Sequence, residues 1–150
     1  MSSARPRLPG PIQALFFRLG ACLLGPLARV NAFDPLARGL ARAFARVTLW
    51  VNRARPSSSL TEVATEWDRM FRHAFPASHL TLLEEDCAQG EITAPCPLGL
   101  AGTGDLPACD RAMEYDREMV RRLGGELTVI ESQARAGVHR CRIAIRARRP

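Results

Sequence analysis

After residue 55, a helical apolar pattern is followed by short strand-like segments, and this arrangement constrains the fold of the chain more than any other feature. Apolar side chains recur at helical spacing from Leu60 to Phe71, and Pro76 ends that helix. Ser59 and Glu62 stand at the spacing of a capping box and predict where the helix begins. The segments 79–86 and 91–94 then have the composition and length of two short strands.

The last third of the chain repeats this pattern of a helix followed by strands. Asp105 and Pro107 predict the start of a helix over 105–123, which Gly124 and Gly125 end. Apolar and polar residues then alternate over 126–133 and 139–147, which predicts two more strands. Because the connections are short, the sequence predicts an α+β fold with a mostly antiparallel sheet, ββ-α-ββ, preceded by N-terminal amphipathic helices.

Charge divides the chain into two parts. Residues 1–55 contain nine Arg and one acid, Asp34, whereas residues 56–150 contain twelve Arg and fourteen acids. We therefore predict a basic helical N-terminal segment, 1–55, and an α+β domain, 56–150. The second part has no excess of positive charge, so nucleic acid is not an expected partner. All basic residues except the three His are Arg, which is more typical of a genome-wide composition than of phosphate recognition.

The segment 35–53 predicts an amphipathic helix with a cationic face. Apolar residues share one stripe, and a separate row of arginines has i, i+4 spacing: Leu36, Leu40, Phe44, Val47 and Val51 in the stripe, and Arg38, Arg42 and Arg46 in the row. One interpretation is a peripheral contact with an anionic membrane through residues 35–53, with Trp50 near the interface. The other is a helix that packs on the domain and leaves its basic side in solvent.

The apolar run 14–28 is interrupted by Arg18, Gly20, Gly25 and Pro26, and it is shorter than the roughly 20 apolar residues of a membrane-spanning helix. A cleaved targeting peptide is the alternative for this region. The five cysteines form no CxxC pair and are odd in number, which favours free thiols in a reducing cytoplasm. We expect a cytoplasmic protein, with a membrane-peripheral location as the alternative.

Asp116 is the residue with the most chemical information. It falls inside the apolar stripe of the 105–123 helix, and Cys109 lies seven residues earlier on the same face. A carboxylate on a buried stripe is costly unless it has a partner, so Asp116 is expected to bind a group or to line a cavity. The alternative is a position at the helix edge, paired with Arg117 or Arg142.

His139 and Cys141 are two residues apart on a predicted strand, so both side chains would point to one face. A thiol beside an imidazole can become a thiolate nucleophile. The alternative is a small buried hydrophobic Cys141. Cys96 stands ahead of a glycine-containing loop where a pocket could open. A metal site from these cysteines and His139 matches no standard spacing, so neither a metal nor another cofactor is expected.

The segment from Cys96 to Ile145 resembles the C-terminal half of the L-2-amino-thiazoline-4-carboxylic acid hydrolase-like family. The resemblance rests on Cys96-Pro97, on Leu106-Pro107-Ala108-Cys109-Asp110, on the helix with Asp116, and on Gly137 ahead of Cys141-Arg-Ile. It implies hydrolytic opening of a small cyclic amidine-like ring, with a carboxylate as general acid or base. The residues that it implies are Cys109, Asp116, Cys141 and His139 as catalytic residues, and Cys96 and Asp110 as substrate-binding residues.

The final hairpin also resembles that of 4-vinyl-reductase-type domains, which bind small molecules and often do no chemistry. The alternative to a hydrolase is therefore a non-catalytic small-molecule-binding module. A third hypothesis is a partner protein that docks through Leu36, Leu40 and Phe44. The sequence leaves the true substrate and the oligomeric state open.

Overall fold

A four-stranded antiparallel sheet covers one side of the molecule. The computed structural model describes residues 10–72, 78–84 and 87–148, with the backbone alone for 78–84. The strands β1 (Ser78–Glu84), β2 (Cys87–Ile92), β3 (Gly125–Glu131) and β4 (Cys141–Ala147) are arranged in the order β1-β2-β4-β3. Every neighbouring pair is antiparallel. The α+β fold class and the antiparallel sheet predicted from the sequence are confirmed.

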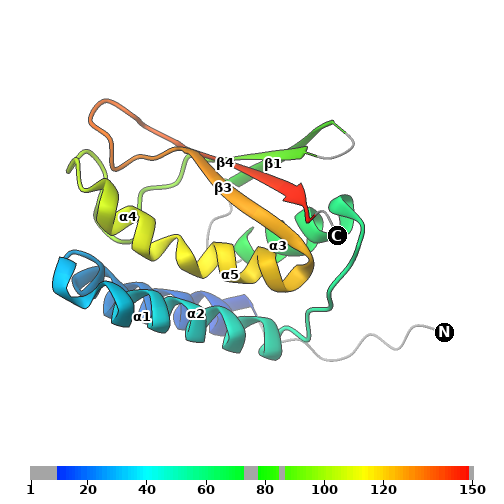
Figure 1. Ribbon diagram of the computed structural model, residues 1–150, viewed down its shortest axis with the longest axis horizontal. Coiled ribbons are helices and arrows are strands. Elements are labelled where there is room, and N and C mark those ends of the chain that lie inside the picture. Colours follow the sequence, from blue (N-terminus) through cyan, green and yellow to red (C-terminus); the bar gives the residue numbers. More distant parts are fainter. Residues whose placement is uncertain (1–9, 73–77, 85–86, 149–150) are drawn as a thin grey trace.

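Two layers of helices lie beneath the sheet (Figure 1). Helices α3 (Leu60–Arg72), α4 (Leu106–Ala112) and α5 (Glu114–Leu123) form the middle layer, and α1 (Gly10–Ala28) and α2 (Asp34–Val51) form the outer one. A single 3-10 turn, Asn31–Phe33, joins α1 to α2. The main core lies between the sheet and the middle layer, and its most completely buried large side chains are Val63, Trp67, Met119, Val120, Leu123, Ile143 and Ile145.

Several element bounds differ from the predicted ones. The helix predicted over 105–123 is two helices that meet at Met113, and the strand predicted from His139 begins at Cys141. Gln89 and Gly90 fall between the two strands predicted over 79–86 and 91–94, but they lie inside β2, where Gly90 pairs with Ile143. The pairing with β4 extends the strand through a residue whose local preference is for turns.

The end of α5 is set by Gly124, as the sequence predicts. Its φ of 109° lies in the left-handed region, and a Cβ at this position would come within 2.2 Å of the Ser57 carbonyl oxygen. The amide of Ser57 also donates to the carbonyl of Leu123 over 2.8 Å. Residue 124 must therefore be glycine for the segment before α3 to pack against the end of α5.

Helix α1 is longer than the broken run predicted from the sequence. It continues through Gly20 and Gly25 and includes Pro26 in its last turn, so the prediction that these residues interrupt it is wrong. Its inner side packs on α2 and α4, which holds the helix together across the glycines. Within the described residues, α1 is the one helix long and apolar enough to cross a membrane by length and composition; a core helix or a signal sequence meets the same criterion.

Helix α2 packs on the rest of the domain, as one of the two sequence interpretations expects, but the contact face is not the predicted one. The buried side of α2 is a row of small residues with one leucine, namely Ala37, Ala41, Ala45 and Leu49. In the predicted stripe, Leu36 and Val47 are exposed, whereas Leu40, Phe44 and Val51 are partly buried. Small residues let two helices approach closely, so α2 can lie against α1 and α5 at once. The sequence pattern therefore identified an apolar face that is partly buried, but not the most deeply buried face of the helix.

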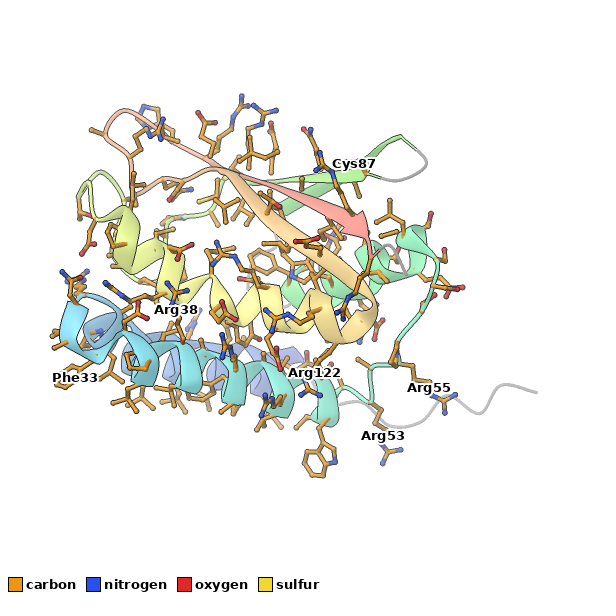
Figure 2. The ribbon with its side chains drawn as sticks, viewed as in Figure 1. Phe33, Arg38, Arg53, Arg55, Cys87 and Arg122 are labelled. Atoms are coloured by element: carbon orange, nitrogen blue, oxygen red, sulfur yellow. The ribbon has the colours of Figure 1, made fainter. Side chains whose placement is uncertain are left out.

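The arginines in the row on α2 are partly exposed, but each forms an ion pair with an acid of α4 or α5. Arg38 Nη2 lies 2.8 Å from Asp110 Oδ2, Arg42 Nε lies 2.8 Å from Glu114 Oε1, and Arg46 Nε lies 3.1 Å from Glu118 Oε1. Arg38 and Arg122 lie between the α2 layer and the α4–α5 layer in Figure 2. The row therefore joins the two helical layers through ion pairs, and the prediction of a free cationic face is wrong.

Candidate ligand-binding cavity

A cavity of about 110 Å³ lies where the three layers meet. Its walls come from all five α-helices, from the end of β2 and the loop after it, and from the segment between β3 and β4 with the first residue of β4. Aromatic rings form much of the lining, namely Phe16, Phe17, Phe44, Phe71 and Tyr115. Two of these rings pack edge-on against others: Phe16 against Phe44 at 5.5 Å and Phe17 against Tyr115 at 5.9 Å between ring centres. An aromatic lining of this kind suits a compact apolar guest.

Asp116 contributes a carboxyl group to this apolar wall. It is only 7% exposed, and its Oδ1 accepts a hydrogen bond from Trp67 Nε1 over 3.1 Å. Burial raises the pKa of Asp116 to about 7, and the Trp67 hydrogen bond and the charge of Arg117 offset only part of that effect. The predicted alternative of an ion pair with Arg117 is not formed, because Arg117 pairs with Asp110 over 2.6 Å.

Three of the cysteines singled out in the sequence, Cys96, Cys109 and Cys141, line the same cavity. The Sγ of Cys109 lies 3.1 Å from Ser132 Oγ, and the Sγ of Cys141 accepts from the backbone amide of Gln133 over 3.3 Å. Burial raises the pKa of both Cys109 and Cys141, and these hydrogen bonds offset it only in part. Both groups are therefore neutral thiols near pH 7.

The imidazole that was predicted beside Cys141 lies elsewhere. His139 precedes β4 and is exposed, whereas Cys141 is half-buried and faces the cavity. The carbonyl of His139 instead accepts from Gln133 Nε2, which also donates to the carbonyls of Ile92 and Ala94. The strand alternation that placed His139 and Cys141 on one face does not hold, because β4 starts only at Cys141.

Asp110 is also outside the cavity lining. It lies on the outer side of α4 and binds Arg38 and Arg117. Burial alone would raise its pKa, but the hydrogen bonds from these two arginines outweigh that effect and lower the pKa. Asp110 therefore joins α4 to α2 through ion pairs. It does not line the cavity, where a substrate-binding residue was expected.

The cavity contains polar atoms but no positive charge. No Arg or His is found among the described residues that line it. No group of three or more metal-ligating side chains could hold an ion in the part of the chain that the structure describes. The residues that sequence analysis missed are the aromatic rings of α1 and Tyr115, because nothing local shows that α1 folds onto the domain.

Comparisons of the chain with family models, with curated proteins and with solved structures give no match. The resemblance to the L-2-amino-thiazoline-4-carboxylic acid hydrolase-like family therefore stays a prediction from the motifs in the sequence.

Proposed function

We propose that this protein is a binding module for a compact, single-ring molecule that presents one neutral or cationic polar group to Asp116. The observation that supports this proposal is an aromatic cavity with one buried carboxyl group in its wall and no cationic side chain among its described lining residues. Apolar protein cavities of roughly 150 Å³ accept benzene, and the smaller volume of about 110 Å³ in this protein restricts the guest to one small ring. The polar group of the guest would hydrogen-bond to the carboxyl of Asp116.

The protonation state of the Asp116 carboxyl group determines which classes of guest can bind. Because its pKa is about 7, Asp116 is an anion at pH 8 and accepts hydrogen bonds from a cation or a neutral donor. An anionic guest would meet a like charge in an apolar cavity, which is strongly unfavourable. We therefore expect benzylamine and benzyl alcohol to bind better at pH 8 than benzoate does.

The test is a titration of the full chain with benzylamine, benzyl alcohol and benzoate, observed by the NMR signal of the Trp67 indole N–H. That group donates to Asp116 and should shift on binding. The variant Ala21→Phe should fill the cavity and abolish the shift, whereas Ala43→Phe, on the exposed side of α2, should not. Absence of a saturable shift with all three probes would contradict the proposal.

A second candidate function is hydrolysis of a small ring, as the resemblance implies. The observation that favours it is that Asp116, with a pKa near neutrality, lies in one cavity with Cys109 and Cys141. Asp116 could then transfer a proton to or from an attacking water. Two facts weigh against a cysteine nucleophile and the carboxylate substrate of that family: both thiols are neutral, and the described lining offers no cation.

This candidate is tested with L-2-amino-thiazoline-4-carboxylic acid and product detection by mass spectrometry. If hydrolysis occurs, Asp116→Asn should abolish it. Iodoacetamide labelling against pH gives a separate readout for the cysteines. We expect Cys109 and Cys141 to react slowly and only above the usual thiol pKa of about 8.5. Rapid labelling of one of them near pH 6 would instead favour the hydrolase.

A further inference from the structure

The outer side of the α1–α2 hairpin exposes an unusual number of large apolar side chains. Among the side chains that the structure describes, eleven large hydrophobic ones are exposed, and nine of these lie between Ile12 and Trp50. We call the following set the outer face: Ile12, Leu15, Leu19 and Leu23 of α1, and Phe33, Leu36, Val47 and Trp50 at or on α2. A concentration of this kind on one side of a protein marks an interaction surface.

The outer face is separate from the surfaces that hold the fold together. The opposite side of α1 carries Gly20, Leu24 and Ala28, which are buried, and the opposite side of α2 carries the row of buried alanines. Leu15, Leu19 and Leu23 follow each other at four-residue spacing, and each is more than half exposed. The packing of this chain therefore does not explain why leucines occupy these three positions.

Charge distinguishes between the classes of partner that could cover this face. Asp34 is the one acid in residues 1–55, and it is bound by Arg38 and Arg111. The exposed arginines Arg18, Arg53 and Arg55 accompany the apolar side chains. In Figure 2, Arg53 projects from the end of α2 on the side away from the sheet. Two copies of this face would bring like charges together, which disfavours a homodimer.

Trp50 gives the face a further property of lipid-binding helices. It is 80% exposed and follows directly on the apolar residues of α2, close to Arg53. Tryptophan is enriched where a protein meets the boundary of headgroups and acyl chains, and arginine on the same helix attracts anionic headgroups. Apolar side chains, an exposed tryptophan and unbalanced positive charge together match the chemistry of an anionic bilayer surface.

We propose that the outer face lies on the surface of an anionic lipid bilayer, with α1 and α2 parallel to the membrane and the sheet directed away from it. Arg38, Arg42 and Arg46 stay in their ion pairs with α4 and α5 in this arrangement. The contact is made by apolar insertion and by Arg18, Arg53 and Arg55. This arrangement is independent of what the cavity binds.

The test uses the full chain and vesicles of phosphatidylcholine with and without phosphatidylglycerol, in a co-sedimentation assay. We expect binding to the vesicles that contain phosphatidylglycerol, and release at high salt because part of the attraction is electrostatic. The triple variant Leu15→Ser/Leu19→Ser/Leu23→Ser should bind about a hundred-fold more weakly, because three half-exposed leucines no longer enter the lipid. The matched control is Leu106→Ser/Ile130→Ser, which changes the exposed hydrophobic residues elsewhere and should bind normally.

Fluorescence gives a second readout that does not depend on sedimentation. Trp50 is exposed and Trp67 is 1% exposed, so a blue shift of emission on adding vesicles reports Trp50. The variant Trp50→Phe should lose the shift and keep most of the binding. Three results would overturn the proposal: equal binding by the triple variant, attachment that resists high salt and alkaline carbonate, as expected of a spanning α1, and a dimer by light scattering that the triple variant abolishes.

Discussion

Helix α5 presents carboxyl groups to two different surroundings, although Glu114, Asp116 and Glu118 follow each other at alternate positions. Glu114 and Glu118 face α2 and are each about as buried as Asp116, which faces the cavity. Burial alone would raise the pKa of all three. On the α2 side, hydrogen bonds from arginines outweigh burial and lower the pKa of both glutamates. On the cavity side, burial dominates and the pKa of Asp116 rises to about 7.

The difference between the two sides shows that charged partners, rather than depth, decide the state of a buried carboxyl group. Glu118 lies within 3.1 Å of Arg46, Arg121 and Arg122. Asp116 instead accepts a hydrogen bond from a neutral group, the indole N–H of Trp67. The side of α5 that faces α2 therefore carries carboxylates that stay ionised near neutral pH, and their ion pairs join the two helical layers. The other keeps a carboxyl group that changes state near pH 7.

The largest expected effect on the free energy of unfolding comes from the variant Asp116→Asn. The pKa of Asp116 is raised in the folded state, so the native protein retains a proton that the unfolded chain releases above about pH 4. Stability should therefore fall as pH rises from about 4 to about 7, and then level off. Asparagine has no such cost, so the variant should be more stable at pH 8 by up to about 4 kcal/mol and similar to the wild type at pH 4.

Urea unfolding across this pH range measures the effect. Asp110→Asn is the matched control, because the pKa of Asp110 is lowered and its loss should not stabilise the protein at pH 8. If Asp116→Asn and the wild type show the same dependence on pH, the carboxyl group of Asp116 is not held in an apolar site, and the contrast between the two sides of α5 fails.

A smaller effect of the opposite sign is expected for Glu118→Gln. The pKa of Glu118 is lowered, so its contribution to stability is present above the unfolded value and is lost as pH falls through the folded value. The variant should lose about 2 kcal/mol at pH 7, because its arginine partners are half exposed and can be rehydrated. The loss should be smaller at pH 3 than at pH 7, because the contribution of a carboxyl group with a lowered pKa declines below the unfolded value of 4.5. Glu126→Gln, at an exposed position on β3, should change stability by less than about 0.5 kcal/mol at either pH.

The smallest expected effect is a change in the pKa of Asp116 in the variant Trp67→Phe. It tests the part of the comparison that concerns the cavity side of α5. Trp67→Phe removes the hydrogen bond that stabilises the carboxylate, so the pKa of Asp116 should rise further, by about one unit. A carboxyl ¹³C titration by NMR measures this change. An unchanged pKa would mean that the indole N–H does not bind the carboxylate in solution.

The sequence predicts local structure here better than it predicts packing. The sequence pattern located β1, β3 and β4 but only the last two residues of β2. It left two alternatives for Asp116, and the structure shows the one in which this residue lines a cavity. Cys96, Cys109 and Cys141 were singled out separately and line that cavity together. These predictions succeed because a period in the sequence determines which residues share a face of one element.

The pattern does not determine which element covers a face. The arginine row of α2 was expected to meet solvent or lipid, and it meets the acids of α4 and α5. The alanines that α2 buries carry too little hydrophobic signal to be recognised as the contact face. The shift of His139 out of β4 follows from strand pairing, since the ladder with β2 begins with Ile92 opposite Cys141. Each of these facts depends on a contact between distant parts of the chain.

Helix α1 separates the cavity from the outer face of the molecule. Its inner side contributes Phe17, Gly20 and Ala21 to the cavity, and its outer side carries the leucines of the outer face. If the outer face lies on lipid as we propose, one helix diameter separates the cavity from the acyl chains. A lipophilic guest would then be supplied from its reservoir in the bilayer, where partitioning concentrates it far above its level in water. The quantity that sets occupancy would be the mole fraction of the guest in the membrane, and affinities measured in plain buffer would underestimate how full the cavity is.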